Sequence, residues 1–435
     1  MNRNLVLNAF SPAQEVTDPE LFAGRREQIK DLSDALRAQG SCPVIYGDRG
    51  LGKTSLAVQC QIIALGQSEL LDSIGASDRA LNPGETFLTF FITCADDVRN
   101  FSDLQKAILN AFRDFVLLDD SRDSSSRQLV DRQTRRKLSL KLVEVEDTRT
   151  YTEKSRALRE EDMSLRERIY REANLLHECY GQRVLVIIDE IDRVGNTEGL
   201  APFIKAMSGD QLKFVLVGVA QSLAQLNLDH PSVERQLWPV PVERMTRSEL
   251  FEVADRALAR LNASQHTSYH FSTSARNALA KAAGGFPWFV HVIGQSALLR
   301  ALDCGTEEVT LEMLKTATSD LINDRFAQHF KDSYQNAVRD SANREIVLRA
   351  FAAWNEQDIP TADIYRTCQR LGVTNPAVYK GHLSSGFYGE PLIAPPFQER
   401  GLVRFRNEMF KRYITLRPSL FRGVDEKVRD AAKEW

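Results

Sequence analysis

One stretch near the N-terminus combines the residue types that bind phosphate, with spaced glycines followed by a lysine and a hydroxyl. It consists of Gly47, Asp48, Arg49, Gly50, Leu51, Gly52, Lys53 and Thr54, with Ser55 next. Glycines let successive backbone N–H groups turn around an anion without a Cβ in the way. Lys53 is long enough to reach the β- and γ-phosphates, and the Thr54 hydroxyl suits Mg²⁺. We expect this stretch to bind ATP, with Lys53 in binding and catalysis and Thr54 as a metal ligand.

A second stretch places two carboxylates directly after an apolar run. Asp189 and Glu190 follow the apolar residues 184–188. Two carboxylates at the end of a buried strand are costly unless they are solvated or bind a cation. We expect Asp189 to enter the shell of Mg²⁺ and Glu190 to polarise the attacking water as the catalytic base. A chance Asp-Glu pair after a strand is the alternative, which the loop upstream disfavours.

Both sets of groups need strands that end near one another. Apolar, β-branched runs predict strands at 43–46, 86–93, 184–188 and 213–219, and a fifth strand around 240–242. The phosphate-type loop lies between the first of these strands and a helix that begins at Ser55, which is the context a P-loop requires. The sequence therefore predicts an α/β fold whose core is a parallel-sheet P-loop ATPase.

The residues ahead of the loop introduce a family resemblance. Phe22-Ala23-Gly24-Arg25-Arg26-Glu27, about twenty residues before the loop, resembles the corresponding segment of AAA+ and STAND ATPases. In those families the segment packs near the adenine, so the resemblance implies that Gly24 and Arg25 contribute to nucleotide binding. An amphipathic helix with a capping turn is the other interpretation of these residues.

The same resemblance suggests two further catalytic residues. The polar residue after the strand 213–219 corresponds to sensor 1, which implies Gln221, with Ser222 as the reserve. Arg235, ahead of the fifth strand, corresponds to an arginine finger, since a guanidinium stabilises phosphoryl charge and stays protonated. It would act on a neighbouring copy in a homo-oligomer or within its own chain. A helix-capping serine and a surface arginine are the alternatives.

A glycine and proline pattern further along resembles the lid motif of STAND and archaeal-type ATPases. Gly284-Gly285-Phe286-Pro287 precedes an apolar helical pattern, and the resemblance implies that Pro287 lies in a helical lid over the nucleotide. Trp288 stands near where initiator-type relatives carry a sensor 2 arginine, which favours the STAND branch. Trp288 as an ordinary core residue is the alternative.

Changes in composition and pattern predict the domain boundaries. They are 1–243 for the ATPase core, 244–335 for the helical lid, 336–420 for a winged helix-turn-helix domain and 421–435 for a short charged tail. Within the core, 119–180 is a charged insertion that ends in an amphipathic helix from about Leu165. The insertion is either a solvated, partly disordered segment or an arm that contacts a protein or nucleic acid.

The predicted winged helix leaves its partner open. Its third helix carries Tyr379, Lys380 and His382, and its hairpin and the residues after it carry Arg404, Arg406, Lys411 and Arg412. These cations favour double-stranded DNA through phosphate contacts, but the region is only mildly basic. The alternative is a signalling or defence regulator in which the same domain contacts protein.

Composition excludes several other classes. With 43% hydrophobic and 26% charged residues, the chain is of the ordinary soluble globular type. Its net charge of −3 implies no general attraction to nucleic acid or membranes. The six cysteines show no Cys-x-x-Cys spacing, so we expect neither a zinc site nor disulfides, and we expect a cytoplasmic protein. The apolar runs are too short to span a bilayer, so no membrane association is expected.

Overall fold

The computed structural model describes residues 3–120, 163–209, 211–220, 235–321, 327–395 and 400–433. The chain divides into two compact units, one of residues 15–48 and 52–243, the other of residues 1–14, 49–51 and 244–435. Most of the predicted charged insertion, 121–162, lies outside the described residues, as does Gln221.

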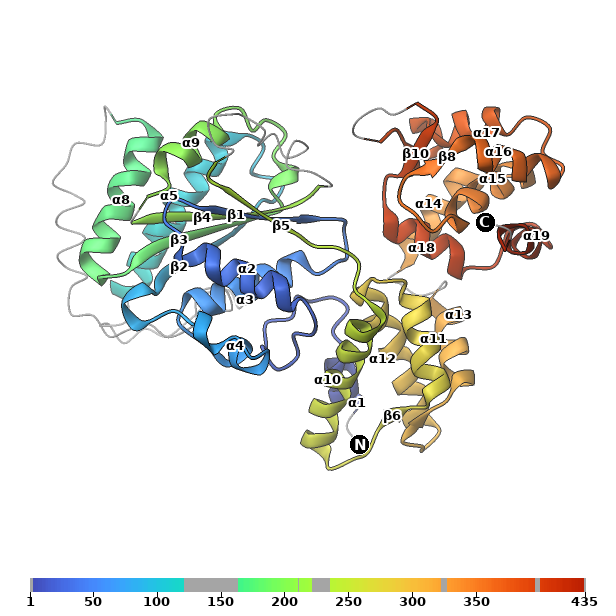
Figure 1. Ribbon diagram of the computed structural model, residues 1–435, viewed down its shortest axis with the longest axis horizontal. Helices are drawn as coiled ribbons and strands as arrows, with labels where there is room; N and C mark the ends of the chain where they lie inside the picture. The colour runs from blue at the N-terminus through green and yellow to red at the C-terminus, as the bar shows by residue number, and fades with distance from the viewer. Residues whose placement is uncertain are drawn as a thin grey trace. The chain divides into compact units, whose positions relative to one another are not determined.

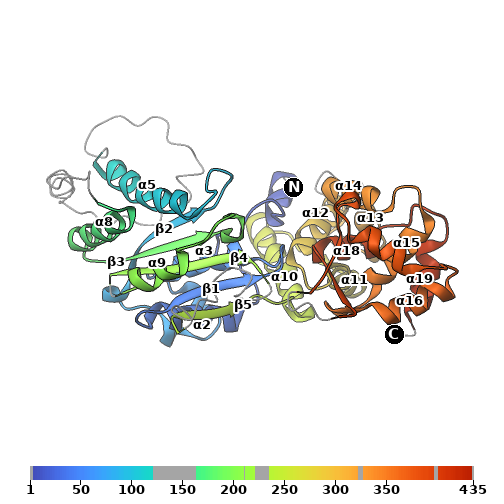
Figure 2. The ribbon, with the colours of Figure 1, turned by 90° about the horizontal axis from the view of Figure 1, so that it is seen from above.

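The first unit is built on a five-stranded parallel sheet, which confirms the predicted α/β fold (Figure 1). Its strands are β1 (Cys42–Gly47), β2 (Phe87–Thr93), β3 (Arg183–Asp189), β4 (Leu212–Val219) and β5 (Leu237–Pro241). The spatial order is β2-β3-β4-β1-β5, and Figure 2 shows the strands side by side. Because all strands run in one direction, their carboxyl ends meet at one edge, where ligands bind in open α/β sheets.

Helices cover both faces of this sheet, as parallel sheets require. Figure 1 shows α2 and α3 on one face, and α5, α8 and α9 on the other. Their bounds are α2 (Arg26–Arg37), α3 (Lys53–Ala64), α4 (Glu69–Ser73), α5 (Phe101–Asp120), α8 (Leu165–Tyr180) and α9 (Leu200–Met207). The strands β3 and β4 are buried along most of their length. This burial explains why they are recognisable as continuous apolar runs.

The helix α8 corrects the predicted extent of the insertion. Ile169, Ala173 and Leu176 on this helix are buried in the same hydrophobic core as the sheet. A capping box starts the helix at Ser164, whose side chain accepts from the backbone N–H of Glu167. Residues 165–180 therefore belong to the core, and the insertion as predicted over 119–180 is too long at its C-terminal end.

The second unit contains a helical bundle whose helices have clear start and stop signals. Its helices are α1 (Arg3–Ala9), α10 (Arg247–Gln265), α11 (Thr273–Ala283), α12 (Pro287–Asp303) and α13 (Leu311–Leu321), with β6 (His270–Phe271) pairing with β7 (Glu308–Val309). Thr246 forms a capping box with Glu249, Gly284 ends α11 with φ 58°, and Pro287 occupies the first turn of α12. The helix α1 was not predicted.

The rest of this unit contains helices and a small antiparallel sheet. The elements are α14 (Gln328–Val338), α15 (Ala342–Ala353), β8 (Ile359–Pro360), α16 (Thr361–Arg370), α17 (Pro376–Leu383), β9 (Leu392–Ile393), β10 (Leu402–Phe405), α18 (Glu408–Leu416) and α19 (Val424–Ala432). The strand β10 pairs with both β8 and β9. Because α19 buries Val424 and Val428, most of the predicted charged tail is a packed helix.

Candidate nucleotide site

The predicted phosphate-binding loop joins β1 to α3 at the carboxyl edge of the sheet. Gly52 has φ 88° and precedes α3, and no side chain caps the start of that helix. The first N–H groups of an α-helix have no intrahelical partner and carry the positive end of its dipole, so they suit an anion. Gly47 has φ 154°, and a Cβ there would lie 2.3 Å from the carbonyl oxygen of Val242. Glycine is therefore required at both ends of the loop.

Lys53 lies within its own loop. Its Nζ donates to the backbone carbonyl of Asp48 at 2.8 Å, and the residue is only 8% exposed. The ammonium group therefore stays next to the backbone that would surround a phosphate. A bound β- or γ-phosphate would offer it a charged acceptor in place of a neutral carbonyl.

Thr54 and Asp189 come together although they lie far apart in the sequence. Thr54 Oγ1 donates to Asp189 Oδ2 at 2.8 Å, and Asp189 Oδ1 accepts from the backbone N–H of Glu190 at the same distance. Burial raises the pKa of Asp189, whereas the hydrogen bonds from Thr54 and Glu190 act against this increase. A hydroxyl and a buried carboxylate form the hard oxygen pair that Mg²⁺ prefers, so the residues present fit this metal.

Glu190 has an unusual backbone conformation at the end of β3. Its φ is 57° and its ψ is 38°, in the left-handed region that non-glycine residues rarely occupy. Its side chain is 36% exposed and forms an ion pair with Arg193 at 3.2 Å, from Glu190 Oε2 to Arg193 Nε. A left-handed residue directly after a metal-ligand candidate is the kind of local strain that clusters at functional sites.

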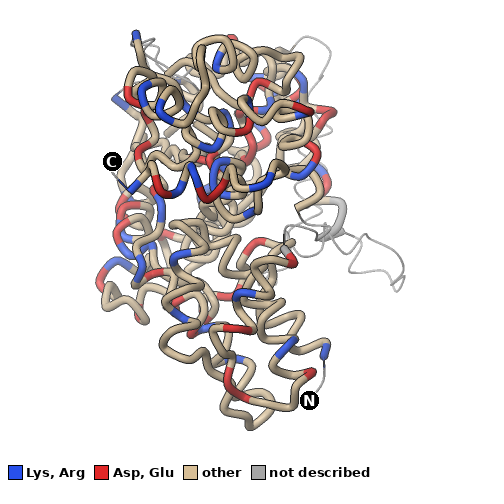
Figure 3. The backbone as a smooth tube through the Cα atoms, turned by 90° about the vertical axis from the view of Figure 1, so that its right-hand side faces the viewer, with Lys and Arg blue, Asp and Glu red and all other residues tan. Residues whose placement is uncertain are grey.

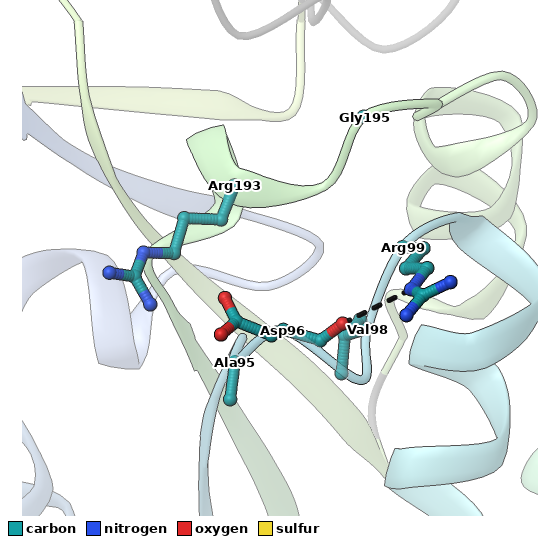
Figure 4. A pocket seen from close by; sticks show the side chains of 6 residues that line it. All are labelled: Ala95, Asp96, Val98, Arg99, Arg193 and Gly195. Carbon is teal, nitrogen blue, oxygen red and sulfur yellow. Dashed lines mark hydrogen bonds between the residues drawn. The ribbon is translucent and has the colours of Figure 1, made fainter.

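Arg193 also borders a cavity of about 550 Å³ beside these residues (Figure 4). The cavity is lined by Ala95, Asp96, Val98, Arg99, Arg193 and Gly195. Sequence reasoning missed Arg193 and the neighbouring Asp192, whose Oδ1 accepts from the backbone N–H of Val219 at the end of β4. Their position directly after the two carboxylates was the available signal.

The remaining predicted residues of the first unit have mixed placements. Gly24 and Arg25 both have positive φ, at 66° and 59°, and Arg25 is buried at the start of α2. The Ser55 hydroxyl accepts from the backbone N–H of Val16 at 3.0 Å, so it is engaged within the protein. Arg235 is exposed in the turn before β5.

In the second unit, Pro287 opens α12 as predicted, whereas Trp288 packs against aromatic rings. Its ring centroid lies 5.0 Å from that of Phe289 and 6.3 Å from that of Phe330. These edge-to-face contacts are typical of a structural aromatic cluster. The structure therefore gives Trp288 a packing role within its unit.

The features described above define a P-loop NTPase, since they combine a glycine-rich loop with Lys53, the Thr54–Asp189 pair and a parallel sheet. Residues 7–367 match the family described as Novel STAND NTPase 1, and the chain belongs to that family. The STAND assignment made from the sequence is thereby confirmed. No curated protein matches the chain.

Solved structures resemble the chain over nearly its whole length but at low sequence identity. An ORC2 protein of Aeropyrum pernix is 15% identical, with a TM-score of 0.49 and coverage of 97% of this chain and 98% of that one. The Walker-type ATPase PABY2304 of Pyrococcus abyssi is 17% identical, with a TM-score of 0.49 and coverage of 93% and 99%. Cdc6p of Pyrobaculum aerophilum is 14% identical, with a TM-score of 0.44 and coverage of 98% of both chains.

Within the described ranges, no helix has the length and apolar character needed to cross a membrane.

Proposed function

We propose that the protein binds Mg-ATP at the loop between β1 and α3, hydrolyses it slowly, and uses the bound nucleotide as a conformational switch. The observation that carries this proposal is the 2.8 Å contact between Thr54 and Asp189, which assembles a Mg²⁺-type oxygen pair beside the loop. The experiment is a comparison of ATP and ADP binding with and without Mg²⁺, together with steady-state release of inorganic phosphate.

Each residue of the site has a distinct part in this proposal. The N–H groups of the loop and of the first turn of α3 bind phosphate oxygens, and Lys53 turns from the Asp48 carbonyl to the β- and γ-phosphates. Thr54 and Asp189 hold Mg²⁺, which when bound neutralises charge on the phosphates. Glu190 accepts the proton of the attacking water. Gln221 and Arg235 are proposed to orient that water and to stabilise phosphoryl charge.

The second unit is proposed to respond to the nucleotide. Gly24 and Arg25 lie near the adenine in this proposal, and Pro287 lies in the lid over it. Arg412 of α18 supports a coupled movement of the helical bundle and the C-terminal elements of this unit, since its Nε donates to the Ala282 carbonyl at 2.8 Å. Glu408 of the same helix forms an ion pair with Arg244, which precedes α10.

We propose that the C-terminal region is a winged helix and that its partner is a protein, not DNA. Two of its four candidate phosphate-binding cations are engaged inside the unit, because Lys411 is 5% exposed and donates to the Glu356 carbonyl, and burial lowers the pKa of Arg412 to about 10. Arg404 and Arg406 form ion pairs with Asp358 and Glu390, respectively. Figure 3 shows basic and acidic residues interspersed along the chain.

A salt titration separates the two partners. If the region contacts protein, duplex DNA should bind weakly even at about 50 mM salt, where phosphate contacts are favoured. Tight binding whose logarithm falls linearly with the logarithm of the salt concentration would instead establish the DNA role. A double change of Arg404 and Arg406 to alanine would then reduce the salt slope by up to about two, roughly one for each lost contact.

A further inference from the structure

The carboxylate proposed as the catalytic base is paired with a cation. Glu190 Oε2 lies 3.2 Å from Arg193 Nε, and both side chains are partly exposed, at 36% and 44%. A guanidinium in this position competes with water for the carboxylate oxygens. In the structure described here, Glu190 is therefore held by Arg193.

A second carboxylate shares a cavity with Arg193. Asp96 lines the cavity together with Arg193, and Figure 4 shows its carboxylate in the space between the two segments. Arg99 lines it too, but its Nε donates to the Asp96 backbone carbonyl at 3.3 Å. Arg193 therefore pairs with Glu190 on its own turn and lines the same cavity as Asp96.

The backbone around the cavity is fixed, so side chains are what can rearrange. The backbone N–H of Gly195 donates to the Arg99 carbonyl at 3.1 Å, and that of Phe101 donates to the Asn196 carbonyl at 3.0 Å. At the other end, the backbone N–H of Cys94 donates to the Asp189 carbonyl at 2.9 Å. An exposed arginine between these segments can change rotamer without moving either one.

We propose that Arg193 is a positioning residue that exchanges between Glu190 and Asp96, and that Glu190 acts as a base only when Arg193 has turned to Asp96. This inference rests on the proposed function, in which Glu190 activates water. The exchange makes and breaks ion pairs only, with no covalent step. It gives the protein a resting state with low turnover, as suits a nucleotide switch.

The exchange predicts opposite effects on ATP turnover when Arg193 and when Asp96 is replaced. Arg193→Ala should raise the steady-state turnover of Mg-ATP about two- to fivefold, the population change that a partly exposed ion pair allows. Asp96→Asn should lower turnover by a similar factor, since Arg193 then stays on Glu190. The double variant should behave like Arg193→Ala alone. Asp97→Asn is the matched control, since it removes a carboxylate that is next to Asp96 in the chain but does not line the cavity, and its turnover should equal that of the wild type.

A second readout needs no nucleotide. Labelling of Glu190 by a water-soluble carbodiimide and an amine, followed by peptide mass spectrometry, should increase in Arg193→Ala and decrease in Asp96→Asn. Equal labelling in all variants would overturn the exchange, whether or not ATP is hydrolysed. The Arg193→Ala variant could bind Mg-ATP and show increased labelling of Glu190, yet hydrolyse ATP at the wild-type rate. That result would overturn the proposal that Glu190 acts as a base only when Arg193 has left it. If no variant binds Mg-ATP, the proposed function fails, while the labelling still decides the exchange.

Discussion

The Thr54 hydroxyl donates to the Asp189 carboxylate at 2.8 Å across 135 positions of sequence. Thr54 comes from the first turn of α3, and Asp189 is the last residue of β3. Because α3 packs on the sheet and both groups lie at its carboxyl edge, two separate motifs become one site. The pair also places a buried carboxylate next to the loop, where a cation would compensate its burial.

The Thr54–Asp189 pair predicts that nucleotide affinity depends on Mg²⁺ through these residues. Mg²⁺ increases the affinity for ATP, and this increase should be about tenfold smaller in Thr54→Ala than in the wild type, because one oxygen ligand is lost. Titration calorimetry with Mg²⁺ and with EDTA measures this gain. Thr54→Ser keeps the hydroxyl and serves as the control, which should retain most of the effect. An equal gain in the alanine variant would place the metal elsewhere.

Glu190 is predicted to act in hydrolysis and not in binding. Glu190→Gln keeps the shape of the side chain but removes the base, so turnover should fall at least about tenfold, the lower range for general-base effects. The dissociation constant for Mg-ATP should change little. Phosphate release and equilibrium binding test the two statements separately, and wild-type turnover in the variant would assign the base to another residue.

The candidate site could be proposed from the sequence because its chemistry depends on local motifs. Gly52, Lys53 and Thr54 need only the strand before them and the helix after them, and Asp189 needs only the apolar strand that it ends. Gln221 and Arg235 were assigned by resemblance, and the first lies outside the described residues. The roles of Gln221 and Arg235 therefore depend on analogy with other ATPases, whereas the Thr54–Asp189 contact follows from how α3 packs on the sheet.

Long-range packing was the part that local patterns could not predict. Lys213 looks like an interruption of an apolar strand, yet its Nζ is buried and donates to the Ala38 carbonyl and to Ser41 Oγ. These acceptors lie at and just after the end of α2, and burial lowers the pKa of Lys213 to about 8. The helix α1 was not predicted because the pattern of its apolar residues is explained only by their packing against α12.

His291 on α12 predicts a dependence of stability on pH. Burial lowers its pKa to about 4, and its Nδ1 lacks a hydrogen-bond partner in the described part of the chain. Since the unfolded residue titrates near 6.5, the unfolded state binds more protons between these values. The contribution of neutral His291 is therefore complete above about pH 6.5 and is lost as the pH falls toward 4, by up to about 3 kcal/mol at about 1.4 kcal/mol for each pKa unit.

His291→Gln tests this dependence because glutamine does not titrate. Urea unfolding of both proteins between pH 7.5 and 4.5 should show the wild type losing more stability than the variant as the pH falls. Parallel curves would mean that the pKa of His291 is the same in the folded and unfolded states.

Phe10 is predicted to anchor the N-terminal segment to α12. It is fully buried, and its ring lies where a Cβ on Gly294 would come within 2.7 Å. Gln295 Nε2 donates to the carbonyls of Leu7 and Phe10 at 2.8 and 2.7 Å. Phe10→Ala should therefore lower the free energy of unfolding of this unit by about 3 to 5 kcal/mol.

The control for Phe10 lies one helical turn away. Leu7 is 39% exposed, so Leu7→Ala should change the free energy of unfolding by only about 0.5 kcal/mol. Chemical unfolding monitored by fluorescence compares the two variants. Similar small losses for both would show that the N-terminal helix is not held by Phe10.

Lys53→Ala tests whether Lys53 and its loop bind the phosphates of ATP. The structure places Lys53 Nζ 2.8 Å from the Asp48 carbonyl, within the loop, so its loss should remove phosphate binding without disturbing the core. Titration calorimetry should show Mg-ATP binding to the wild type and at least a hundredfold weaker binding to the variant, the loss of about 2.7 kcal/mol expected for a buried charge-assisted contact. Far-UV circular dichroism should be the same for both proteins. Wild-type affinity in Lys53→Ala would show that this loop does not bind the phosphates of ATP.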